Sequence, residues 1–229
     1  MQYVRESFNN GLDIFESNHP KHLEEVEEVL SETDYHVKHC NQDEREHELI
    51  FDPVGTNKFL QEGYESQGWQ TGVNLKAPGY SSGRDIDLFK QPVAGEIQFS
   101  HYTSLDSDMN RLQRLYEDRL SLENDEDVEA GVVIVVIPDM PTSQSVSHFQ
   151  QAIGRAAPES LVSIPTLIFG ITVPNTGEEV TYNYYPKPRA RTILQQETVD
   201  FRVQFLRSKV NHEVYPENDE TNVPDPDGT

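Results

Sequence analysis

Two carboxylates and one amide lie close together in a segment that is expected to form a hairpin. Asp87 precedes a turn at Pro92, and Glu96 and Gln98 follow that turn on an apolar stretch. Side chains alternate between the two faces of a strand, so Glu96 and Gln98 share one face. Pro92 cannot donate to a central ladder and therefore suits the start of a strand, after a turn that lets residues 86–89 pair alongside. This hairpin would bring Asp87 close to Glu96.

Two carboxylates held this close repel each other, which raises their pKa values unless a cation neutralises them. A hard divalent cation that prefers oxygen ligands, above all Mg²⁺, meets that need. A metal held in this way can polarise a phosphodiester and activate water. The pair therefore predicts a metal-dependent nuclease site. The alternative is a solvated strand face on a chain that has 40 acidic residues.

The elements around this hairpin follow an α/β order. Residues 131–137 form an unbroken, mostly β-branched run, which is typical of a strand buried on both faces. A second helix is predicted over 145–156 and a further buried strand over 166–172, which gives an α/β fold. A first helix is predicted just after the hairpin, capped by Ser104 or Asp106, because apolar residues recur there at helical spacing: Leu105, Met109, Leu112, Leu115 and Tyr116.

The same residues carry a resemblance to a known family. The block DLFKQPVAGEIQFSHY at residues 87–102 resembles the BglII/BstYI-type restriction endonucleases, which have the PD-(D/E)XK nuclease fold. A helix that opens with His19 and Pro20, a helix that follows Phe51 and a strand at 165–171 share the resemblance, which covers most of residues 1–174. Most PD-(D/E)XK nucleases carry a lysine two residues after the glutamate, and here that residue is Gln98.

The resemblance implies a central mixed β-sheet flanked by helices and a homodimeric type II endonuclease. Its substrate would be duplex DNA with a short palindrome built around GATC. By the same resemblance, Asp87, Glu96 and the backbone carbonyl of Ile97 bind Mg²⁺, and Gln98 helps to position the attacking water. An amide has no basic pKa in the useful range, so Gln98 itself cannot act as the base.

The net charge of the chain argues against contact with DNA. A formal charge of -22 should repel phosphates, which proteins usually contact through Lys and Arg. Either the protein avoids nucleic acid, or it works in a cytoplasm salty enough to screen the repulsion, since the Debye length falls to ~3 Å at about 1 M salt. Lysines are scarce and acidic residues spread along the whole chain, which favours a halophilic protein in a high-salt cytoplasm.

Local positive charge then marks the candidate DNA contacts. The best recognition candidate is Arg155, in an expected loop over 153–158, because an arginine there could contact guanine through two hydrogen bonds. Its alternative role is a surface salt bridge. The candidates for phosphate or guanine contacts are Arg84, Lys90, Arg111, Arg114, Arg155 and the basic residues of 187–191.

Length and composition agree with one main domain and an appendage. We expect an endonuclease-like catalytic and DNA-binding domain over 1–174, a C-terminal extension over 175–210 that adds a strand or a dimer arm, and a disordered acidic tail over 211–229. The one cysteine, Cys40, excludes an intrachain disulfide framework and fits a reducing cytoplasm, and we expect it to be a buried small hydrophobe. No apolar run approaches the ~20 residues needed to cross a bilayer, so no membrane association is expected.

Two other functions stay open. The chain could be a DNA-binding protein that has kept this fold and lost all or most cleavage, and the amide of Gln98 gives a reason to consider it. It could also be an acidic protein-interaction module with no role on nucleic acid.

Overall fold

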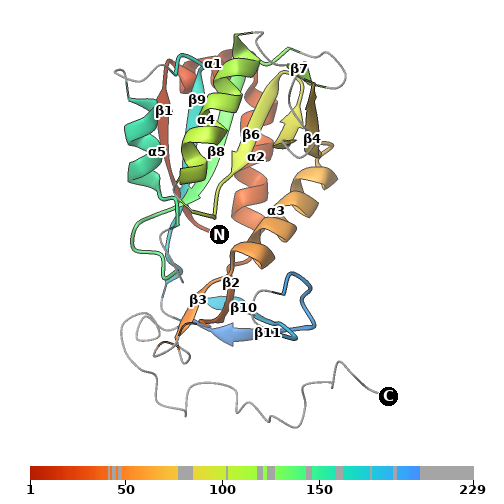
Figure 1. The fold of residues 1–229 in the computed structure, drawn as a ribbon, viewed down its shortest axis with the longest axis vertical. Coiled ribbons are helices and arrows are strands. Elements are labelled where there is room, and N and C mark those ends of the chain that lie inside the picture. The colour runs from red at the N-terminus through yellow and green to blue at the C-terminus, as the bar shows by residue number, and fades with distance from the viewer. Residues whose placement is uncertain are drawn as a thin grey trace. The chain divides into compact units, whose positions relative to one another are not determined.

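The computed structural model describes residues 1–40, 42, 45, 48–76, 85–101, 103–117, 121–122, 127–142, 146–157, 162–175, 177–187 and 190–201. They form two compact units (Figure 1). The first unit combines Met1–Thr33, Asn57–Met140 and Gln144–Val173. The second combines Asp34–Thr56 and Pro141–Ser143 with the chain from Pro174 onward. The second unit thus includes residues 34–56, which lie within the range expected for the first domain.

The first unit is built on a mixed sheet with the strand order β1-β9-β8-β6-β5-β4-β7. Strands β6, β8 and β9 are parallel, and their neighbours on both sides are antiparallel. This arrangement confirms the predicted α/β fold with a central mixed sheet. The strands are β1 (Tyr3–Phe8), β4 (Gln70–Lys76), β5 (Asp85–Lys90), β6 (Val93–Ile97), β7 (Ser121–Leu122), β8 (Ala130–Val136) and β9 (Thr166–Ile171).

Strands β8 and β9, two of the three parallel strands, are buried along their whole length. Every residue of β8 and of β9 is buried, and Ile134 of β8 pairs with Phe169 of β9. Strands covered on both faces need apolar side chains at every position, which explains the unbroken β-branched run seen in the sequence.

Helices cover both faces of this sheet. In Figure 1, α4 (Thr103–Tyr116) and α5 (Phe149–Ala156) lie in front of the sheet, and α1 (Gly11–Asn18) and α2 (Pro20–Glu32) lie behind it. Helix α3 (Pro53–Ser66) starts two residues after Phe51, as predicted. Helix α2 opens with Pro20 at its first turn, where proline is well tolerated, which confirms the helix expected there.

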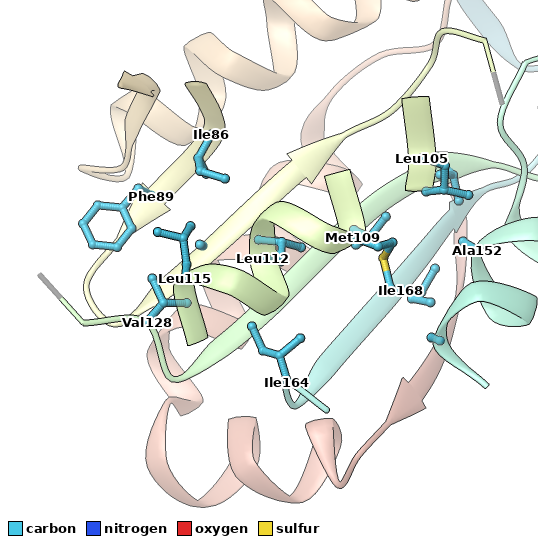
Figure 2. Close-up of a cluster of buried hydrophobic side chains, with 14 of the residues drawn as sticks. Ile86, Phe89, Leu105, Met109, Leu112, Leu115, Val128, Ala152, Ile164 and Ile168 are labelled. Atoms are coloured by element: carbon cyan, nitrogen blue, oxygen red, sulfur yellow. The ribbon is translucent and has the colours of Figure 1, made fainter. Parts of the chain in front are cut away.

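Helix α4 supplies one side of the main hydrophobic core (Figure 2). Its fully or almost fully buried residues recur at the spacing that the sequence indicated, and they pack with residues of β8, β9 and α5. The cluster includes Leu105, Met109, Leu112 and Leu115 of α4, with Val133, Val135, Ile168 and Ala152. The apolar stripe fixes the rotation of α4, and with it the direction of the polar side chains between the apolar ones.

The second unit is a small sheet with the order β11-β10-β2-β3. Its strands are β2 (His36–His39), β3 (Leu49–Phe51), β10 (Glu179–Tyr184) and β11 (Gln195–Asp200). Strands β10 and β11 lie in the C-terminal extension expected over 175–210, for which a strand was one of the two alternatives. The tail expected over 211–229 lies outside the described residues.

A fully buried carboxylate ties this second unit together. Asp52 accepts hydrogen bonds from Asn183 Nδ2 at 2.7 Å and from the Tyr185 hydroxyl at 2.6 Å, and its other oxygen lies 3.0 Å from Lys38 Nζ. Gly55 makes room for this group, because a Cβ there would stand 2.1 Å from Asn183 Nδ2.

Cys40 is buried, as expected. Among the helices of the described residues, none has the length and apolar character needed to span a membrane.

Candidate active site

The hairpin of β5 and β6 brings Asp87 and Glu96 together, as predicted. Leu88 pairs with Gly95, and the same antiparallel register continued by one residue places Asp87 opposite Glu96. The backbone ladder between the strands ends at Leu88 and Gly95. Beyond that point Asp87 Oδ2 accepts the hydrogen bond of the Ile97 N–H at 2.8 Å. The carboxylate thus lies where the two strands separate.

The backbone carbonyl of Ile97 points to the same side of β6. The N–H of the next residue, Gln98, donates to Ile134 on β8 at 2.8 Å. Successive residues of a strand direct their backbone groups to opposite neighbours, so the Ile97 carbonyl points toward β5 and Asp87. Two carboxylates and this carbonyl therefore converge on the opening between β5 and β6.

Glu96 is almost fully buried, at 1% exposure, and it is not isolated. Arg111 Nε of α4 donates to Glu96 Oε1 at 2.9 Å, and the Asp87 carboxyl is near enough for its charge to act on Glu96. Burial raises the pKa of Glu96 well above its usual value, and the charges of Asp87 and Asp108 add to this, while Arg111 opposes it.

The half-buried Asp87 carboxyl is shifted in the same direction. Burial raises the pKa of Asp87 and the charge of Asp108 adds to it, while the Ile97 N–H, Glu96 and Arg111 act in the opposite direction. Both carboxyls are therefore held in an environment that disfavours two negative charges without a cation.

The side chain of Gln98 lies beside this pair, but it is held by partners of its own. Gln98 Nε2 donates to Asp108 Oδ2 on α4. Gln98 Oε1 accepts from the Ser100 N–H at 2.8 Å and from the Ser100 hydroxyl at 2.6 Å. The amide is thus fixed at both ends within the site.

Asp108 was not among the site residues predicted from the sequence. Its Oδ1 accepts from Arg111 Nη2 at 2.6 Å, so Arg111 bridges Glu96 and Asp108. Burial raises the pKa of Asp108, and Arg111 and Gln98 oppose the shift. A signal was present in the sequence, since Asp108 stands within the apolar stripe of α4, three residues after Leu105 and four before Leu112, where a charged residue is unexpected.

The oxygen atoms of Asp87, Glu96 and the Ile97 carbonyl suit a small, hard divalent cation. Carboxylate and carbonyl oxygens are the ligands such a cation prefers, and the raised pKa values of Asp87 and Glu96 indicate surroundings that would favour an added positive charge. Within the described part of the chain, no cluster of three or more His, Cys, Asp or Glu side chains suits a metal. A cation here would therefore depend on the two carboxylates, the Ile97 carbonyl and water.

Lys90, a predicted DNA contact, faces the protein. Its Nζ donates to Glu25 Oε1 at 2.6 Å, to Glu25 Oε2 at 2.7 Å and to the Gln67 carbonyl at 2.7 Å. Trp69 Nε1 also donates to Glu25, which is buried rather than part of a solvated acidic helix face. An ammonium has three N–H donors, so these contacts leave Lys90 none for a phosphate.

The other predicted contacts lie in different settings. Arg111 belongs to the carboxylate site, and Arg84 lies outside the described residues. Arg114 is half-buried on α4. Arg155 pairs with Asp106 at 2.7 Å, on the surface. The helix predicted over 145–156 is confirmed from Phe149 to Ala156 as α5, so the loop expected over 153–158 is wrong for residues 153–156. The apolar residues of this last turn pack in the core.

Comparison with known proteins decides the family. The family profile described as restriction endonuclease BglII/BglIII matches residues 3–171, most of the chain. The chain belongs to this family. The resemblance seen in the block at residues 87–102 is thereby confirmed, and with it the enzyme class, a type II restriction endonuclease of the BglII type.

Relatives of known structure share the fold. Type II restriction enzyme BglII of Bacillus subtilis is 27% identical over 203 residues, which are 84% of this chain and 91% of that protein. The crystal structure of BglII complexed with a DNA 16-mer matches with a TM-score of 0.76 at 25% identity, over 87% of this chain and 90% of that chain. The crystal structure of free BglII matches with a TM-score of 0.64 at 24% identity, over 87% and 93% of the two chains. The predicted PD-(D/E)XK-like fold is confirmed by these matches.

Proposed function

We propose that this restriction endonuclease hydrolyses phosphodiester bonds of duplex DNA at a short, GATC-centred palindrome, with Mg²⁺ and as a homodimer. The observation that carries the proposal is the meeting of Asp87 and Glu96 where β5 and β6 separate. The related BglII has been crystallised with DNA, which supports a duplex substrate. The palindrome and the dimer come from the family resemblance alone.

Each residue of the site has a role in this proposal. Asp87, Glu96 and the Ile97 carbonyl hold Mg²⁺, which when bound supplies polarisation of the scissile phosphate and activation of water. Arg111 donates a hydrogen bond of 2.9 Å to the Glu96 carboxylate and partly neutralises its charge. Gln98 offers a hydrogen bond to the attacking water or to a phosphate oxygen and does not take a proton.

DNA contacts need positive charge that is exposed. Arg155 is the best candidate among the described residues, because Asp106, its partner, is itself exposed and a phosphate or a guanine could replace it. We propose Arg84 and Arg114 as further contacts. Lys90 is not retained, because its three donors are engaged inside the protein.

Digestion of plasmid DNA tests the proposal. The purified protein should cut into discrete fragments in high KCl with Mg²⁺, and sequencing of the ends should give one palindrome that contains GATC. Asp87→Asn and Glu96→Gln should each lose about 10²–10⁴-fold in rate, since several kcal/mol of charge stabilisation depend on the metal. Both variants should still shift the same DNA in a mobility assay with Ca²⁺.

The alternatives predict different results. A specific mobility shift without cleavage under any divalent metal would make the chain a DNA-binding protein. Absence of DNA binding across a salt series would leave the acidic interaction module. Full cleavage by Asp87→Asn would overturn the assignment of the site.

A further inference from the structure

We propose that Asp108 and Arg111 of α4 are a positioning pair for the reaction. Asp108 fixes the orientation of the Gln98 amide, and its negative charge offsets the positive charge of Arg111 that would otherwise act on Glu96. The inference rests on the proposed function, because it assigns the two residues a role at the same site. Neither residue is required to contact the metal or the substrate.

The hydrogen bonds of the Gln98 amide fix its orientation. A primary amide has two N–H donors and two acceptor positions on its oxygen. Ser100 uses both acceptor positions with its N–H and its hydroxyl, and Asp108 takes one of the two donors. The opposite orientation would set the amide nitrogen against the Ser100 N–H and the amide oxygen against the Asp108 carboxylate. Asp108 and Ser100 together therefore fix one orientation.

This orientation leaves Gln98 one free function. With both acceptor positions and one donor occupied, one N–H remains to donate to a water or a phosphate oxygen. Gln98 then cannot orient a water by accepting a hydrogen bond from it. Because Asp108 helps to set the direction of this single N–H, it determines how Gln98 can act at the site.

The charge of the cluster also depends on the pair. Asp87, Glu96 and Asp108 are three acidic groups, and Arg111 is the cation that contacts two of them, at 2.9 Å from Glu96 and 2.6 Å from Asp108. With all four groups charged, the net charge is about -2, which matches one divalent cation. Asp108 compensates Arg111, so that the charges of Asp87 and Glu96 stay available to the metal.

Both residues of the pair are also largely buried. The side chain of Asp108 is 6% exposed and that of Arg111 is 18% exposed. Burying such charges costs free energy, and an apolar residue at position 108 would continue the stripe of α4. A sequence that breaks its own helical pattern in this way usually does so at a functional site.

Asp108→Asn and Arg111→Gln should shift the affinity for a divalent cation in opposite directions. Asp108→Asn removes the negative charge that offsets Arg111. The positive charge of Arg111 then opposes a cation at Glu96, so the affinity for a divalent cation should fall by about 10-fold or more. In Arg111→Gln, a positive charge next to Glu96 is removed, so the affinity should rise. Arg111→Lys keeps the charge and should stay close to the wild type.

The experiment is Mn²⁺ titration of the full-length protein without DNA, with free Mn²⁺ counted by electron paramagnetic resonance. Asp106→Asn is the matched control, because it is the same substitution on the same helix at an exposed position, and its Mn²⁺ affinity should equal that of the wild type. Circular dichroism confirms the fold of each variant. Since Arg111→Lys keeps the positive charge that Arg111→Gln removes, their comparison decides the sign even if Asp108→Asn does not fold.

The outcomes separate the two proposals. A fall for Asp108→Asn together with a rise for Arg111→Gln supports the positioning pair. Shifts of the same sign, or none beyond those of the control, overturn it and leave the proposed function intact if the wild type binds Mn²⁺ and cuts DNA. A wild type that binds no Mn²⁺ overturns both.

Discussion

Gln98, just after β6, donates a hydrogen bond from its amide nitrogen to the carboxylate of Asp108 on α4. The contact joins Gln98 to a helix that otherwise packs against the sheet through apolar side chains. It explains why an amide is tolerated at this position, because the surrounding groups demand a donor on one side and an acceptor on the other.

Exchanging the donor and the acceptor of this contact tests it. Gln98→Glu sets two carboxylates against each other, and the rate of plasmid cleavage should fall about 10–100-fold, as for other groups that support a metal site. The double variant Gln98→Glu with Asp108→Asn restores a donor opposite an acceptor at unchanged net charge and should recover part of the rate. A double variant no faster than Gln98→Glu would contradict the role of this contact.

The buried Glu96 carboxyl predicts a pH dependence of stability in the absence of metal. Burial raises the pKa of Glu96 in the folded protein, whereas the unfolded chain has the ordinary value of about 4.3. The folded state therefore binds this proton more tightly, and the stabilisation by it is full below the unfolded pKa and is lost as the pH rises through the folded pKa. Asp87 and Asp108 shift in the same direction.

Glu96→Gln removes this titration and should show it by difference. In EDTA, the melting temperature of the variant minus that of the wild type should grow as the pH rises from 5 to 9, and scanning calorimetry measures it. Addition of Mg²⁺ at the upper end should stabilise the wild type more than the variant. A difference that stays constant with pH would show that Glu96 is ionised as easily in the folded chain as in the unfolded one.

Lys90 pairs with the buried Glu25, and we expect Lys90 to matter for stability rather than for DNA binding. Lys90→Met leaves Glu25 only the more distant ammonium of Lys21, at 3.7 Å, and should cost up to about 3–5 kcal/mol in the free energy of unfolding by urea. Glu25→Gln combined with Lys90→Met should recover much of that loss. The salt slope of DNA binding should not change, whereas the loss of a phosphate contact would reduce it by about 1.

The charge of -22 predicts that salt stabilises the protein. Its acidic groups repel one another in the folded state, and at about 1 M salt the Debye length is only ~3 Å. The melting temperature should therefore rise as KCl increases from about 0.1 to 2 M, and the same titration on Asp87→Asn controls for effects at the active site. A melting temperature that is constant or falls would argue against adaptation to a salty cytoplasm.

The sequence was most informative where a single periodicity decided the structure. The alternation around Glu96 predicted the hairpin, and the β-branched run predicted the buried strand β8. The features that the sequence did not predict depend on contacts between residues that lie far apart in the chain. Lys90 turns inward because Glu25, 65 residues earlier, is buried beside it. The second unit combines residues 34–56 with the C-terminal strands, a union that no local pattern reveals.

Asp108 shows the limit most clearly. Its position in an apolar stripe was visible, but its partner Gln98 lies on another element, and only the packing of α4 brings the two together. A charged residue inside a helical stripe is therefore a reason to look for a buried partner before the structure is known.

The central claim is that Asp87 and Glu96 share one divalent cation, and crystals of the protein with its DNA and Mn²⁺ test it most directly. Anomalous difference maps should show one Mn²⁺ between the two carboxylates, with oxygen ligands at about 2.1 Å, and the peak should be lost in Asp87→Asn. Cleavage-competent crystals with no ion at this position, or with Mn²⁺ held by other residues, would contradict the claim.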